Sequence, residues 1–136
     1  RFEQAPVRSA LAEVGIDSAP TLLATWVTDR NGLERFAGQA LAVTDDQPRI
    51  EYAPWVRSQE IKRVLPALLD LRVSVPLRNA DLAYSRTLDA EQQRLMQFYR
   101  ASLHAYEGDR AAWGRDIRQV LQEDGANPYY RWFFGD

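Results

Sequence analysis

The chain has 136 residues, of which 46% are hydrophobic and 26% are charged, so it is long enough for one globular domain with a buried core. The net charge of -2 gives no electrostatic reason to expect nucleic acid or an anionic membrane surface as a partner. The absence of cysteine excludes disulfides, thiolate catalysis and sulfur-ligated metals, and it leaves the redox compartment open.

Two short helices are predicted at the start of the chain. Pro6 is tolerated in a first helical turn, apolar residues recur at helical spacing up to residue 14, and Gly15 can end the helix. Asp17 and Ser18 offer an N-cap for a second helix, whose apolar face runs through Trp26 and Val27. We expect Asn31-Gly32 to end or redirect this helix, with one further helical turn at 33–36.

Residues 43–54 differ from the helical segments around them. Thr44-Asp45-Asp46 followed by Pro48 is typical of a tight turn, and the alternation over 49–53 predicts a short strand. Asp45 and Asp46 are adjacent and cannot both point the same way in a regular element, so one can cap backbone N–H groups while the other faces outward.

This acidic segment has two open interpretations, which are compatible with each other. Its residues can simply build the turn, or at least one carboxylate can meet a cationic ligand. Tyr52 and Trp55 could then supply aromatic walls, with cation–π contacts of roughly 0.5–2 kcal/mol.

A helix that Ser58 could cap is predicted to present Ile61, Val64, Leu65, Leu68 and Leu69. Pro66 lies inside this helix, where the missing N–H predicts a kink or a split. Residues 72–76 alternate briefly, as in an edge strand or an extended linker. The polar stretch that follows predicts a boundary near residue 80, which divides the chain into regions 1–80 and 81–136.

The region 81–136 predicts an antiparallel helical hairpin. Apolar residues from Leu95 to Tyr106 share one face, Gly108 follows as a stop, and Asp89 with Gln92 resembles a capping box. The second helix, at about 109–123, aligns an apolar face of four residues: Trp113, Ile117, Val120 and Leu121. The turn between the helices resembles that of a tetratricopeptide-type helix pair.

The chain ends in an aromatic tail, Tyr129-Tyr130-Arg131-Trp132-Phe133-Phe134. We expect these rings to pack against the hairpin, and the alternative is an interface with another subunit or a missing domain. His104 is the sole histidine and has no partner at ligand spacing, so no metal site is predicted. Neither a catalytic triad nor a glycine-rich nucleotide loop can be built from these residues.

The segment Thr44 to Tyr52, preceded by Leu33 to Gly38, resembles the C-terminal region of bacterial spermidine synthase-like proteins, which join a membrane-embedded N-terminal half to an aminopropyltransferase-type Rossmann domain. The resemblance covers residues 1–57 well and the remainder only in kind. It implies that the parent transfers an aminopropyl group from decarboxylated S-adenosylmethionine to a polyamine. The cofactor loop and catalytic aspartate segment of that family have no matching positions here, so no catalytic residue and no cofactor site is assigned.

The resemblance implies tentative polyamine-facing roles for Asp45, Asp46, Glu51 and Tyr52. The chain begins with Arg1-Phe2, as if in mid-protein, so we interpret it as a soluble fragment, inert by itself, of a parent at the inner membrane, with this part cytoplasmic. Its expected partners are the missing Rossmann-type domain, a polyamine, and a second copy bound through the aromatic tail. The predicted fold is mainly α, with short helices around a small extended segment and a tetratricopeptide-like hairpin. The alternative function is a helical protein–protein interaction module.

Overall fold

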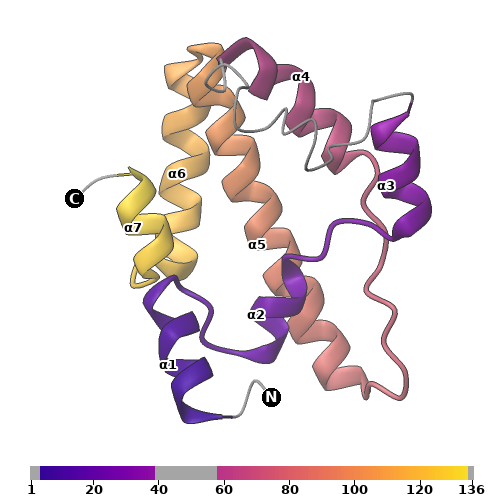
Figure 1. Cartoon of the computed structure of the whole chain (residues 1–136). Helices are drawn as coiled ribbons and strands as arrows, with labels where there is room; N and C mark the ends of the chain where they lie inside the picture. Colours follow the sequence, from indigo (N-terminus) through magenta and orange to yellow (C-terminus); the bar gives the residue numbers. More distant parts are fainter. Residues whose placement is uncertain (1–3, 39–57, 135–136) are drawn as a thin grey trace, which may run out of the picture. The chain divides into compact units, whose positions relative to one another are not determined.

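The computed structural model describes residues 4–38 and 58–134, and within these ranges it contains seven helices and no strand, which confirms the prediction of a mainly α fold (Figure 1). The helices are α1 (Ala5–Glu13), α2 (Ala19–Ala24), α3 (Arg30–Ala37), α4 (Ser58–Leu69), α5 (Leu82–Glu107), α6 (Arg110–Asp124) and α7 (Pro128–Phe134). None of the described helices is both long and apolar enough to cross a membrane.

The chain divides into two compact units. The first combines Arg1–Trp26 with Val75–Asp136, and the second is the intervening stretch Val27–Ser74. The predicted regions 1–80 and 81–136 follow chain order instead, and their assignment to parts of a larger enzyme stays a prediction.

In the first unit, α1 and α2 begin at the positions that the sequence indicates, and α1 also ends there. Proline lies in the first turn of both helices, and Gly15 has the positive φ of 79° that the connection between them requires. The Ser18 hydroxyl accepts a hydrogen bond of 3.2 Å from the Thr21 N–H and so caps α2. The helix ends at Ala24, earlier than predicted, so Trp26 and Val27 follow it rather than belonging to it.

The long helix α5 and helix α6 form the predicted antiparallel pair (Figure 1). Two side-chain contacts join them, the ion pair of Arg94 with Asp124 at 3.4 Å and the approach of His104 Nδ1 to Asp116 Oδ2 at 3.2 Å, so residue numbers rise along one helix as they fall along the other. Gly108 ends α5 in the left-handed conformation. Asp109 caps α6, and the hydrogen bond from the Ala112 N–H lowers the pKa of the Asp109 carboxyl below its usual value.

Two further predictions about this pair are corrected, and a third stays untested. The helix α5 begins at Leu82 with Asp81 as its N-cap, so Asp89 lies inside the helix and forms no capping box. Of the predicted apolar face of α6, Ile117 and Val120 are buried, whereas Trp113 and Leu121 are each 36% exposed. The resemblance to a tetratricopeptide pair stays a prediction.

The core of the first unit is aromatic. Phe98 on α5, Val120 on α6 and Tyr130 on α7 are buried together, with Leu95, Tyr99 and Tyr129 packed around them. The ring centroid of Phe98 lies 5.1 Å from that of Tyr129 and 5.2 Å from that of Tyr130. The prediction that the tail packs against the hairpin is therefore confirmed for these two tyrosines, whereas the side chains of 132–134 lie outside the description.

The second unit contains α3 and α4. Asn31 and Gly32 lie within α3 rather than interrupting it, because the Asp29 carboxylate caps the helix by accepting from the Gly32 N–H at 2.8 Å. Pro66 lies within α4, which is not split. The Val73 N–H donates to the Val27 carbonyl at 2.9 Å, so the two ends of this unit run next to each other, and 72–76 form an extended linker rather than a strand. The predicted strand at 49–53 lies outside the described residues.

Candidate functional site

The sequence predicts a site that contains Asp45, Asp46, Glu51 and Tyr52. These residues belong to 39–57, outside the described residues. The same holds for Trp55, which was considered as an aromatic wall. The candidate site that the structure itself offers is a cavity of about 220 Å³ within the first unit.

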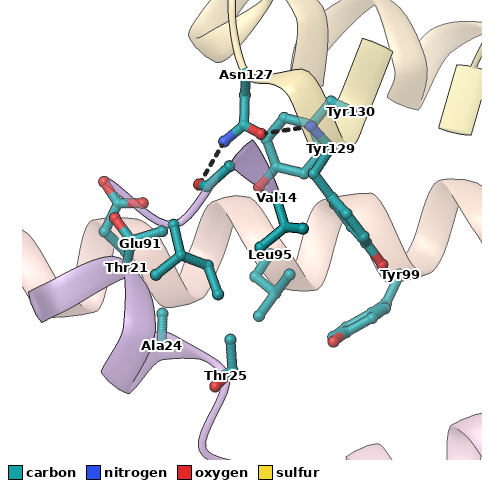
Figure 2. A pocket seen from close by; sticks show the side chains of 12 residues that line it. Val14, Thr21, Ala24, Thr25, Glu91, Leu95, Tyr99, Asn127, Tyr129 and Tyr130 are labelled. Atoms are coloured by element: carbon teal, nitrogen blue, oxygen red, sulfur yellow. Dashed lines mark hydrogen bonds between the residues drawn. The ribbon is translucent and has the colours of Figure 1, made fainter. Parts of the chain in front are cut away.

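Four segments that are distant in sequence line this cavity (Figure 2). The α1–α2 connection contributes residues 14–16, and helix α2 with its C-cap contributes Thr21, Ala24 and Thr25. Helix α5 contributes Glu91, Leu95 and Tyr99, and the start of the C-terminal tail contributes Asn127, Tyr129 and Tyr130. In Figure 2 the α5 residues lie between the tail on one side and α2 on the other.

The α5 wall follows directly from helical spacing. Glu91, Leu95 and Tyr99 are four residues apart and therefore lie one above the other on a single face. This order places a carboxylate at one end of the wall, an aliphatic side chain in its middle and a phenol at the other end. The wall is thus graded from charged to aromatic.

Asn127 holds the N-terminal connection against the C-terminal tail. Its Nδ2 donates to the Gly15 carbonyl at 3.2 Å, and its Oδ1 accepts from the Tyr129 N–H at 3.0 Å (Figure 2). The same Nδ2 also donates to Asp124 Oδ2 at 3.0 Å. A Cβ atom at Gly15 would overlap Asn127 Oδ1, so this approach requires glycine as well as the positive φ. One side chain therefore fixes two walls of the cavity.

Beside the cavity, the described residues include the Arg94 guanidinium placed between the carboxylates of Glu91 and Asp124. Arg94 Nη1 donates to both oxygens of the Glu91 carboxylate, at 3.1 and 3.2 Å, and to Asp124 Oδ2 at 3.4 Å. The Glu91 side chain is only 18% exposed, so it is largely shielded from solvent. Because one guanidinium faces two carboxylates, the acidic charge at this edge is only partly neutralised.

The tyrosines of the tail stay neutral over the physiological range. Burial raises the pKa of the Tyr130 phenol to about 12, and burial also raises the pKa of Tyr129. The cavity is accordingly bordered by uncharged phenol rings, an amide, small and aliphatic side chains, and one carboxylate. The lining also includes two hydroxyls: Thr21 Oγ1 donates to Asp17 Oδ1 at 3.2 Å and Thr25 Oγ1 donates to the Leu22 carbonyl at 2.7 Å. This combination suits binding through shape and a few polar contacts.

A second polar group lies between α5 and α6 and was missed by the sequence analysis. His104 Nδ1 and Asp116 Oδ2 are 3.2 Å apart, and both atoms are buried, but their orientation does not make a hydrogen bond. His104 and Asp116 are twelve residues apart, on either side of the turn at Gly108. Aligning the two predicted helices antiparallel about this turn could have indicated that these side chains face each other. Within 4–38 and 58–134 no three His, Cys, Asp or Glu side chains gather as a metal site would require.

No family model, curated protein or solved structure matches this chain. The function is therefore argued from the residues themselves.

Proposed function

We propose that this chain is a non-catalytic, mainly helical part of a spermidine synthase-like protein, where it braces or completes the active site of the parent. The observation that carries this proposal is the sequence Thr44 to Tyr52 together with its upstream context, Leu33 to Gly38. In this proposal the parent transfers an aminopropyl group from decarboxylated S-adenosylmethionine to a polyamine, and the missing Rossmann-type domain holds that co-substrate.

The chemistry of the acidic segment supports a substrate-facing role. Asp45, Asp46 and Glu51 provide three carboxylates within seven residues, next to Tyr52. Polyamines are flexible polycations, and charge-assisted hydrogen bonds to carboxylates are stronger than neutral ones.

The proposal is tested in the full-length parent protein by measuring aminopropyl transfer. We expect Asp45→Asn and Glu51→Gln to lower kcat/KM for the amine by about tenfold, the loss expected for one charge-assisted contact. Glu60→Gln, an exposed position on α4, is the matched control and should leave kcat/KM unchanged. Wild-type kinetics in both variants, or transfer activity in the 136-residue chain alone, would contradict the proposal.

A second candidate is a helical protein–protein interaction module that includes self-association. It is favoured by Trp113 and Leu121 on α6, which are large apolar side chains with 36% exposure each. We expect sedimentation velocity to detect reversible association, which Trp113→Gln combined with Leu121→Gln should abolish. A monomer at every concentration would reject self-association.

A further inference from the structure

We propose that the cavity between α2, α5 and the C-terminal tail binds a small organic cation that has an apolar body of about one ring and a single ammonium group. This site is separate from the acidic segment 44–52, and the inference does not depend on the function proposed above. Its elements are the Glu91 carboxylate, the apolar wall of Ala24 and Leu95, and the phenol rings of Tyr99 and Tyr130.

The volume sets the size of the ligand. An apolar protein cavity of about 150 Å³ accepts benzene, so the present 220 Å³ accommodates one ring with a short substituent. A nucleotide, with its base, ribose and phosphate, would not fit in this volume. The small side chain of Ala24, which is 2% exposed, is what keeps the space open on the α2 side.

The charge of the lining residues determines whether a cationic or an anionic ligand is favoured. Glu91 is the one carboxylate among the described lining residues, which include no arginine, lysine or histidine. An ionised carboxylate has about four acceptor positions, so the two hydrogen bonds from Arg94 leave capacity for an ammonium donor. With Asp124 sharing the same arginine, an incoming cation meets a net negative charge.

The aromatic residues favour a cation in the same way. The faces of phenol rings carry negative charge density, and an ammonium group over such a ring gains roughly 0.5–2 kcal/mol. The Tyr130 phenol is neutral at physiological pH, as a phenol of ordinary pKa already is, and burial raises its pKa further to about 12, so it remains a hydrogen-bond donor. Both properties distinguish this cavity from a purely aliphatic one.

The same features disfavour a ligand with several charges. The ammonium groups of an extended polyamine lie several carbon atoms apart, so only one of them can reach Glu91. The others would lie among Ala24, Leu95 and the neutral hydroxyls of Thr21 and Thr25, where an ammonium group loses hydration and meets no second carboxylate among the lining residues. The structure therefore assigns a monoamine to this cavity, rather than spermidine or putrescine.

The test compares three single-ring probes that differ in charge: benzylamine, benzyl alcohol and benzoate. Each is titrated into the 136-residue chain while ¹H–¹⁵N chemical shifts are recorded. We expect benzylamine to bind with a dissociation constant on the order of 1 mM. Benzyl alcohol should bind about tenfold more weakly and benzoate more weakly still, with the largest shifts at Gly15, Leu95 and Tyr130.

Two variants connect the binding to this cavity. Glu91→Gln should reduce the affinity for benzylamine to that for benzyl alcohol, and Glu107→Gln, the same change at an exposed position of the same helix, should leave the preference intact. Ala24→Leu should fill the cavity and abolish binding of all three probes, and the dispersion of its spectrum reports whether the variant is folded.

Several results would overturn the inference. These are the failure of all three probes to bind, equal affinity for the three, or shifts that map away from the cavity. A preference for spermidine or putrescine over benzylamine at these residues would overturn the assignment of a single charge. If Glu91→Gln does not fold, the charge series on the wild-type chain still decides the question. None of these results depends on aminopropyl transfer, so the two proposals fail separately.

Discussion

Gly15 and Gly108 both have the positive φ that favours glycine, but their surroundings differ. Gly15, at φ 79°, faces Asn127 across the cavity wall, and a Cβ atom there would overlap that side chain. Gly108, at φ 82°, has no atom within 4 Å of such a Cβ. Comparing substitutions at these two glycines therefore separates the free-energy cost of the backbone conformation from the free-energy cost of steric overlap.

We expect Gly108→Ala to reduce the free energy of unfolding by about 1 kcal/mol, through backbone strain alone. Gly15→Ala should reduce it by roughly 2–4 kcal/mol, because the Asn127 amide must also move and loses its hydrogen bonds. Urea unfolding of the two variants measures both values. Equal losses would show that the Asn127 contact contributes nothing to stability.

The phenol of Tyr130 predicts a loss of stability at high pH. Its pKa in the folded chain is raised from 10.0 to about 12, so the neutral form is favoured by folding. This contribution is fully present below the unfolded pKa and is lost as the pH rises from 10 towards 12. Urea unfolding across that range should therefore show a falling midpoint, and the fall should be smaller in Tyr130→Phe. An identical pH dependence in the two proteins would argue against burial of this phenol.

At the scale of elements, short-range chemistry accounts for the helix signals that the sequence revealed. Pro6, Pro20 and Ser18 act within three residues of a helix start, and Gly108 acts at a helix end, so each is visible in the sequence alone. The hairpin followed from helical spacing together with Gly108.

We expect Ser18→Ala to destabilise the first unit by about 1 kcal/mol, because the Thr21 N–H then loses its acceptor at the start of a helix of only six residues. Ser18→Asp restores an acceptor and should recover most of that loss. Thermal unfolding monitored by circular dichroism compares the two. Equal destabilisation by both substitutions would mean that the hydroxyl acts through its contact with the Thr21 side chain instead.

The features that the sequence did not reveal depend on contacts between distant residues. Asn31-Gly32 resembled a helix stop, but Asp29 caps the helix, and the missing side chain of Gly32 leaves room for Thr28. Asp89 has the capping-box spacing to Gln92, but the N-cap of α5 is Asp81, eight residues earlier. The cavity could not be predicted, because its walls come from segments up to about a hundred residues apart and periodicity carries no information on which faces meet.

At the scale of the whole molecule, the first unit is built from both ends of the chain. The N-terminal 26 residues pack with residues from Val75 onward, and the intervening unit enters and leaves through neighbouring positions, Val27 and Val73, joined by a backbone hydrogen bond of 2.9 Å. Insertions whose ends lie close together interrupt a host unit with little disturbance.

This arrangement predicts that residues 27–74 can be replaced by a short glycine-serine linker. The first unit should keep cooperative unfolding, because its aromatic core around Phe98, Val120 and Tyr130 contains no residue of the deleted stretch. Circular dichroism and urea unfolding check this, with Phe98→Ala in the shortened chain as a control that should lose about 3–5 kcal/mol. Non-cooperative unfolding of the shortened chain would mean that the two units stabilise each other.

The contribution of Tyr130 to the core has a consequence for biosynthesis. A ribosome releases the chain from its amino end, so α1 and α2 emerge long before the aromatic residues that they pack beside. Until translation has passed residue 130, the apolar face of the nascent amino-terminal helices has no partner from the tail. The first unit can therefore close only after residue 130 has been synthesised, whereas the inserted stretch, residues 27–74, has been synthesised before that point.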